Sequence, residues 1–146
     1  MKQLIDTNIL IYAANLSSPY FEKAKKFLDK ELRSGAFFCI TTGIIYEFLR
    51  VTTHENIFKT PLIYPQAFEF ISCIVKDHNA QILLPSENHL ETLSDVIKSI
   101  IRPKGNIFHD IETVVLMKEN SVNTIVTADN DFLQFRFLNV INPLQD

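Results

Sequence analysis

Glycine and cysteine are both scarce in this chain of 146 residues. Only three glycines are present, which leaves little room for flexible linkers, and the length is ordinary for one domain, so we predict a single domain over residues 1–146. The two cysteines, Cys39 and Cys73, have apolar neighbours and lack the spacing of zinc ligands. We expect them to pack as small apolar side chains rather than to form a disulfide.

Long apolar runs and runs of like charge are also absent. The longest apolar stretches are too short to cross a membrane, and the N-terminal segment lacks the cleavage pattern of a secretory signal. These absences predict a cytoplasmic protein with no membrane partner. The net charge of -3 argues against a protein that holds nucleic acid by bulk electrostatics, so any contact with nucleic acid must be local.

Short apolar runs alternate with segments whose apolar residues recur at helical spacing. Strands that alternate with helices predict a parallel sheet covered on both faces. The sequence therefore indicates the α/β class, with a parallel sheet of about five strands and helices on both faces. A helix from Ser86 is expected to bury one stripe, formed by Leu90, Leu93, Ile97, Ile100 and Ile101. The strand-like runs cover residues 1–5, 36–40, 80–84, 123–127 and 138–141.

Acidic residues stand where the predicted strands end. Asp6 follows the first strand, and Asp129 and Asp131 follow the strand at 123–127. In an open α/β sheet, ligands bind in the crevice outside the carboxyl ends of the strands. Asp110 begins a helical run, and Glu47 lies in a largely apolar helical run, where a carboxylate is costly unless a cation meets it. We expect these acids to meet at one edge of the sheet.

Each acid also has a simpler explanation. Asp6 fits a helix N-cap, Glu47 fits an ion pair with Arg50 three residues on, and Asp110 fits the positive end of its helix. Taken together, clustered carboxylates would repel one another and raise each other's pKa unless a cation neutralised them. Oxygen ligands without Cys or His select Mg²⁺ or Mn²⁺, and we take His109 as packing or substrate-side rather than as a ligand.

A hard metal with access to water suits the hydrolysis of phosphodiester bonds. Asp129 leaves the strand first and should point over the crevice, whereas Asp131 precedes a short helical run and is predicted to cap it. Arg102 and Lys104 precede the third acidic segment and are expected at the rim of the site, where they would hold phosphates of the substrate.

The ordered set of motifs resembles the PIN-domain ribonucleases, in particular the VapC-type toxins of bacterial toxin-antitoxin pairs. It consists of Asp6-Thr7-Asn8, Glu47, Asn106-x-x-His109-Asp110 and Thr127-x-Asp129-x-Asp131-Phe132. The chain departs from the family in having Ile111 where Ala is common and Ser121 where Gly is common.

The resemblance implies a PIN-like domain that acts as a metal-dependent endoribonuclease and as the toxin of a type II pair, with RNA as substrate, an antitoxin as partner and a homodimeric assembly. The catalytic, Mg²⁺- or Mn²⁺-binding residues it implies are Asp6, Glu47, Asp110 and Asp129, with Asp131 as an accessory ligand. The substrate-binding candidates are Thr7, Asn8, Arg102, Lys104, Asn106 and Thr127.

Other classes fit less well. A phosphoacceptor receiver domain would need an acidic pair after the first strand and a lysine after the last. A haloacid-dehalogenase-type phosphatase would need Asp-x-Asp where this chain has Asp6-Thr7-Asn8. The remaining alternative is a catalytically weak PIN-like module that binds RNA or protein. The complete acid set argues against it, because a scaffold has no reason to keep four carboxylates that repel one another.

Overall fold

The computed structural model describes residues 1–145. Its centre is a five-stranded sheet in the order β3-β2-β1-β4-β5, in which every neighbouring pair is parallel. This confirms the predicted α/β class and the parallel sheet. The strands are β1 (Lys2–Ile5), β2 (Phe37–Thr41), β3 (Gln81–Leu83), β4 (Thr124–Val126) and β5 (Asn139–Ile141).

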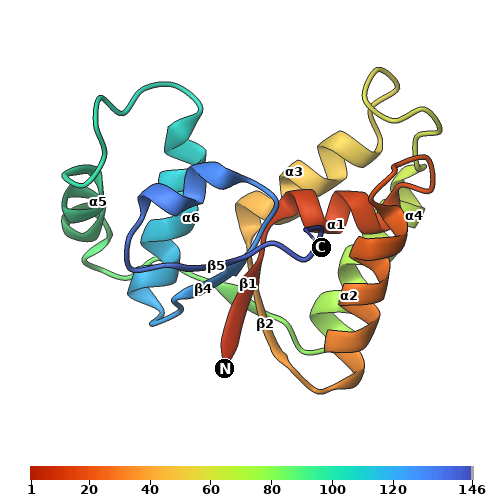
Figure 1. Ribbon diagram of the computed structural model, residues 1–146, viewed down its shortest axis with the longest axis horizontal. Helices are drawn as coiled ribbons and strands as arrows, with labels where there is room; N and C mark the ends of the chain where they lie inside the picture. The colour runs from red at the N-terminus through yellow and green to blue at the C-terminus, as the bar shows by residue number, and fades with distance from the viewer. Residues whose placement is uncertain (146) are drawn as a thin grey trace.

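Helices cover both faces of this sheet, as predicted. The helices α1 to α4 lie on one side and α5 and α6 on the other (Figure 1). The α-helices are α1 (Thr7–Ala14), α2 (Phe21–Arg33), α3 (Thr42–Thr52), α4 (Tyr64–Ser72), α5 (His89–Ile97) and α6 (Ile107–Glu119), with a π-helical turn η1 (Cys73–Asp77) and a 3-10 helix η2 (Asn130–Gln134). None of the helices in this part of the chain is long and apolar enough to cross a membrane.

The strand order creates a switch point between β1 and β4. The chain runs from β1 to β2 to β3 in one direction, and β4 then adds to the other side of β1. Right-handed crossovers place the helices of these two halves on opposite faces, which leaves a crevice outside the carboxyl ends of β1 and β4. In the β1–β4 register Ile5 pairs with Val126, and the Asp6 N–H donates to the Val126 carbonyl at 3.0 Å. The residues that follow the two strands, Asp6 after β1 and Thr127 after β4, therefore lie side by side.

The core holds this edge of the sheet firmly. Burying an aliphatic side chain of this size stabilises the fold by roughly 1.5–3 kcal/mol, and the apolar side chains of β1, β4 and α6 are almost wholly inaccessible. Because α6 is fixed by so many such side chains, its first turn has a well-defined position beside the switch point. The buried residues are Leu4, Ile5, Ile125, Val126, Ile111, Val114, Val115 and Met117.

The prediction that a helix from Ser86 buries one apolar stripe is partly wrong. The helix α5 begins at His89 and ends at Ile97, so Ile101 lies beyond it and is 91% exposed. Leu90 is 78% exposed, and Val96 is buried in its place against the core. Cys39 is buried, Cys73 is half-buried and both are free thiols, as expected.

Candidate active site

Asp6 is the N-cap of α1, and a network of hydrogen bonds fixes its carboxylate. Its Oδ1 accepts the Thr7 N–H at 2.7 Å, and its Oδ2 accepts the Thr127 hydroxyl at 2.7 Å and the Asn8 amide at 3.1 Å. Asn8 also donates to Thr127 Oγ1 at 3.0 Å and accepts the Ala128 N–H at 3.1 Å. Asn8 and Thr127 therefore orient Asp6 and join the end of β4 to the start of α1.

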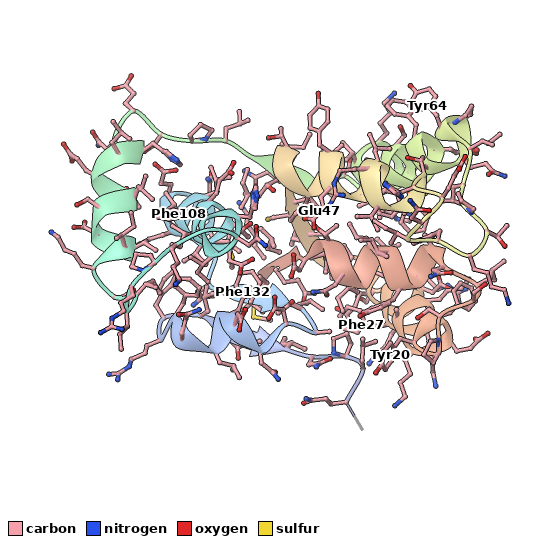
Figure 2. The ribbon with its side chains drawn as sticks, turned by 90° about the horizontal axis from the view of Figure 1, so that it is seen from above. Tyr20, Phe27, Glu47, Tyr64, Phe108 and Phe132 are labelled. Carbon is pink, nitrogen blue, oxygen red and sulfur yellow. The ribbon has the colours of Figure 1, made fainter. Side chains whose placement is uncertain are left out.

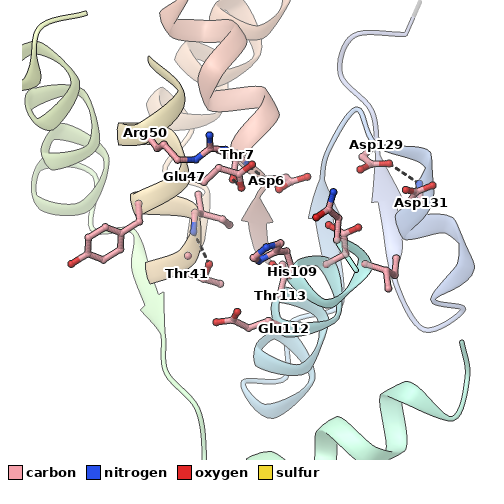
Figure 3. A pocket seen from close by; sticks show the side chains of 16 residues that line it. Asp6, Thr7, Thr41, Glu47, Arg50, His109, Glu112, Thr113, Asp129 and Asp131 are labelled. Carbon is pink, nitrogen blue, oxygen red and sulfur yellow. Dashed lines mark hydrogen bonds between the residues drawn. The ribbon is translucent and has the colours of Figure 1, made fainter. Parts of the chain in front are cut away.

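The cleft outside these strand ends has a volume of about 720 Å³ and lies between α3 and α6 (Figure 3). Of the predicted substrate-binding residues, Thr7 and Asn106 line it, whereas Asn8, Thr127, Arg102 and Lys104 do not. The structure thus brings every predicted acid to one cleft but leaves the two predicted cations outside it. The six carboxylate side chains in its lining belong to Asp6, Glu47, Asp110, Glu112, Asp129 and Asp131.

Glu47 projects from α3 on the side that faces α1 (Figure 2). Its Oε2 accepts the Thr7 hydroxyl at 3.1 Å, so Thr7 connects Glu47 to Asp6 through its hydroxyl and its N–H. The expectation that an apolar environment demands a cation for Glu47 is wrong, because the side chain is exposed to the cleft. The simpler interpretation of an ion pair with Arg50 is also wrong, since no such pair forms among the described residues.

Three further carboxylates form a tight group. Asp110, Asp129 and Asp131 each have one carboxylate oxygen that lies within 4.8 Å of the other two. The prediction that Asp131 caps the following turn is wrong, because Asp129 is the N-cap of η2 and accepts the Asp131 N–H at 2.8 Å. The 3-10 helix begins at Asn130, two residues before its apolar anchor Phe132, and this places the cap one acid earlier. The Asp131 carboxylate is thereby left available to the group.

The electrostatics of the cleft are those of an acid cluster that no ion pair neutralises among residues 1–145. Burial is the main cause that raises the pKa of Asp110 to about 7, and the surrounding acids Asp129, Asp6, Asp131 and Glu47 add to it. Burial likewise raises the pKa of Asp6 to about 6, although its hydrogen bonds from Thr127 and Thr7 oppose the rise. A cation in the cleft would relieve both effects.

Sequence reasoning missed several residues that line the cleft. Arg50 lies on α3 three residues after Glu47, and Thr113 lies on α6 three residues after Asp110. Helical spacing from the predicted acids would have found both, because residues three and four apart share a face. Figure 3 shows His109 projecting from α6 into the cleft, which agrees with the substrate-side interpretation rather than packing.

The comparisons with known proteins agree with this geometry. The family model of the PIN domain matches residues 4–138. Ribonuclease VapC48 of Mycobacterium tuberculosis is 26% identical over 144 residues, which is 98% of each chain. Ribonuclease VapC25 of the same species is 25% identical over 140 residues, covering 96% of this chain and 97% of that one.

Solved structures show the same fold at lower identity. The structure of VapBC2 from Rickettsia felis, bound to a DNA fragment from its promoter, has a TM-score of 0.66 at 17% identity and covers 97% of this chain and 98% of its own. The Mycobacterium tuberculosis toxin VapC20, described as cleaving the sarcin-ricin loop, has a TM-score of 0.66 at 11% identity, with 93% and 96% covered. The strand order, the acid-lined cleft and the match over 4–138 together place this chain in the PIN-domain family.

Proposed function

We propose that this protein is a metal-dependent endoribonuclease that acts as the toxin of a type II toxin-antitoxin pair. The observation that carries the proposal is the convergence of the predicted acids Asp6, Glu47, Asp110, Asp129 and Asp131 on one cleft at the switch point of the sheet. The relatives with the name ribonuclease VapC support the choice of RNA as substrate.

The acids fit a hard divalent cation. Asp110, Asp129 and Asp131 can bring three carboxylate oxygens within 4.8 Å of one another, and this group contains no Cys or His ligand that would favour zinc. We infer that Mg²⁺ or Mn²⁺ is held by these residues together with Asp6 and Glu47. Such a cation, when bound, lowers the pKa of a water molecule and offsets the charge that develops on the phosphate.

The protein's own groups position this site. Thr7 joins two acids, because its N–H donates to Asp6 and its hydroxyl donates to Glu47. Asp6 is also held by Thr127, so its carboxylate orientation is set before any cation binds. A carboxylate held in this way loses little rotational freedom on coordinating a metal, which favours tight binding.

The predicted RNA contacts fall into three groups. Thr7 and Asn106 lie in the cleft lining, which supports them as contacts for RNA next to the cleaved bond. Asn8 and Thr127 lie outside the lining and both donate to Asp6, so they support the position of that acid. Arg102 and Lys104 are exposed beyond the cleft, and as contacts for flanking RNA they stay a prediction.

A nuclease that acts on cellular RNA needs a partner that restrains it. We propose an antitoxin with an Arg or Lys side chain that enters the acidic cleft, because clustered carboxylates without metal need a counter-charge. If co-expression with the adjacent small reading frame left growth inhibition unchanged, the antitoxin proposal would fail. The same role implies that the protein works in the cytoplasm, where the RNA is.

A homodimer is the assembly we propose. The exposed aromatic pair on α4 supports it, since Tyr64 and Phe68 are 63% and 46% exposed and their ring centroids lie 5.8 Å apart. Light scattering of the purified protein should give twice the chain mass, and Phe68→Asp should shift it toward the monomer. A monomeric wild type would overturn this assembly.

The reaction is tested with purified protein and single-stranded RNA. Cleavage should require Mg²⁺ or Mn²⁺, stop with EDTA and not resume with Ca²⁺, whose larger and looser coordination shell places water poorly. Full activity in EDTA would refute the metal-dependent mechanism. Absence of cleavage together with intact RNA or protein binding would favour the alternative, a catalytically weak PIN-like module.

A further inference from the structure

A cation and an aromatic ring line the α3 wall of the cleft, and the metal site uses neither. Among residues 1–145, Arg50 is the one Lys or Arg in the cleft lining. Tyr46 lies one turn earlier, lines the same cleft and is 73% exposed. Residues four apart on a helix are surface neighbours, so Tyr46 and Arg50 form a continuous strip, called here the α3 strip.

The Arg50 side chain has no partner within the described chain. Its guanidinium carries five N–H donors, and six carboxylates line the same cleft, yet it forms no ion pair with any of residues 1–145. Glu47, the single acid on α3, instead accepts the Thr7 hydroxyl. A planar fork of donors with no internal partner fits the two oxygens of a phosphate group.

The charge of the cleft gives this arginine a specific role. The acids repel an RNA backbone, so a phosphate that lies away from the metal needs a cationic side chain to meet it, and Arg50 is the one Lys or Arg in the described lining that can do so. Tyr46 lies one helical turn before Arg50 on α3 and lines the same cleft, and its exposed ring offers a flat face of the kind on which unpaired bases stack. Charge and ring together match one nucleotide, with its phosphate on Arg50 and its base on Tyr46.

We propose that the α3 strip holds one unpaired nucleotide of the RNA next to the cleaved bond, with the Arg50 guanidinium on its phosphate and the Tyr46 ring against its base. This inference rests on the proposed ribonuclease function and adds to it the two residues that hold the substrate next to the cleaved bond. The substrate is RNA that is single-stranded at the cleavage site, because a paired and stacked base cannot present its face to Tyr46.

Binding is measured separately from cleavage. Fluorescence anisotropy follows a short labelled single-stranded RNA in Ca²⁺, and a gel verifies that the strand stays intact. Arg50→Ala should weaken binding by roughly tenfold and reduce the salt slope by about 0.7. Arg50→Lys should recover part of the affinity, because it keeps the charge but loses the fork. Tyr46→Ala should weaken binding by roughly five- to a hundredfold, whereas Tyr46→Phe keeps the stacking face and should bind like the wild type.

A matched control removes the same charge elsewhere. Arg136 is exposed outside the cleft, so Arg136→Ala should change RNA affinity little. The proposal is overturned if Arg50→Ala binds as Arg136→Ala does, if Tyr46→Ala binds as the wild type does, or if duplex RNA binds as tightly as the single strand. Unchanged melting temperatures of the variants exclude misfolding as the cause of any loss.

The two proposals can fail independently. If the wild type binds RNA through the α3 strip but does not cleave it in Mn²⁺, the nuclease proposal fails and this one stands. If the wild type cleaves RNA and Arg50→Ala keeps the same KM, this proposal fails and the nuclease stands. If the wild type binds no RNA, both fail.

Discussion

Neutralising Asp110 should stabilise the metal-free protein while abolishing its activity. Its carboxylate has no hydrogen-bond partner among the described residues, and burial and the neighbouring acids raise its pKa from 3.8 to about 7. Asn keeps the shape and removes the charge. Without solvent screening, the rise corresponds to about 4 kcal/mol of native-state destabilisation above pH 7. Because the side chain is only half-buried, screening reduces this to about 1–2 kcal/mol.

For a chain of this length, about 1–2 kcal/mol corresponds to a rise in Tm of about 3–6 °C. The assay is thermal unfolding in EDTA at a series of pH values. A carboxyl with a raised folded-state pKa stabilises the fold below its unfolded pKa, and this stability is lost as pH rises through the folded pKa. The advantage of Asp110→Asn should therefore be small near pH 3.8 and grow until pH exceeds about 7.

Addition of Mn²⁺ should reverse the order of the two melting temperatures, so that the wild type melts above Asp110→Asn. The wild type should gain stability by mass action, whereas Asp110→Asn, with weaker metal binding, should gain less. Glu112→Gln is the matched control, because it removes an exposed charge from the same helix, outside the tight group of three acids. If Asp110→Asn melts below the wild type in EDTA above pH 7, or if its advantage does not depend on pH, the account of an unfavourable acid cluster is wrong.

Four other substitutions, at three residues, test separate parts of the structure. Asp129→Asn keeps the cap of η2 and should lose cleavage and Mn²⁺ affinity with little change in Tm, whereas Asp129→Ala should also cost about 1 kcal/mol in urea unfolding. Asp131→Asn should weaken Mn²⁺ binding in calorimetry, because Asp131 belongs to the carboxylate group and is not a cap; unchanged affinity would remove it from the site. Burial raises the pKa of Glu119, but hydrogen bonds with Ser86, which precedes α5, and with His89 of α5 outweigh this and hold its pKa below the ordinary value of 4.5. Glu119→Gln should therefore destabilise the protein at pH 7, and the loss in urea unfolding should shrink as pH falls below 4.5; a constant loss would contradict the assignment.

The sequence predicted the sheet and the positions of the acids because both follow from local patterns. Short apolar runs end just before Asp6 and shortly before Asp129, and parallel strands bring their carboxyl ends to the same edge of the sheet. The sequence did not show that Thr7 joins Asp6 to Glu47, because that contact depends on how α1 and α3 pack. Which side of α3 faces the cleft also decides the environment of Glu47, and its apolar sequence neighbours gave no sign of its exposure.

The errors at chain turns have a common physical cause. Asp129 and Asp131 are both suited to begin a turn. Which of them becomes the cap depends on where the chain leaves β4, and the type of side chain does not determine that position. Likewise, Leu90 and Ile101 continue a helical stripe in the sequence, but α5 ends at Ile97, so Ile101 lies beyond the helix, and Leu90 in its first turn is exposed. The sequence predicts Arg50 only as a partner for Glu47, whereas its place in the cleft lining depends on which side of α3 faces the cleft.

The central claim is that the carboxylates of the cleft hold the metal that RNA cleavage requires. One Mn²⁺ titration, with metal occupancy and the initial rate of RNA cleavage measured on the same sample, tests it directly. Occupancy and rate should rise together for the wild type, and Asp129→Asn should shift both curves to higher Mn²⁺ concentrations. A rate that is already maximal without bound Mn²⁺, or a variant that loses metal and still cleaves at the wild-type rate, would contradict it.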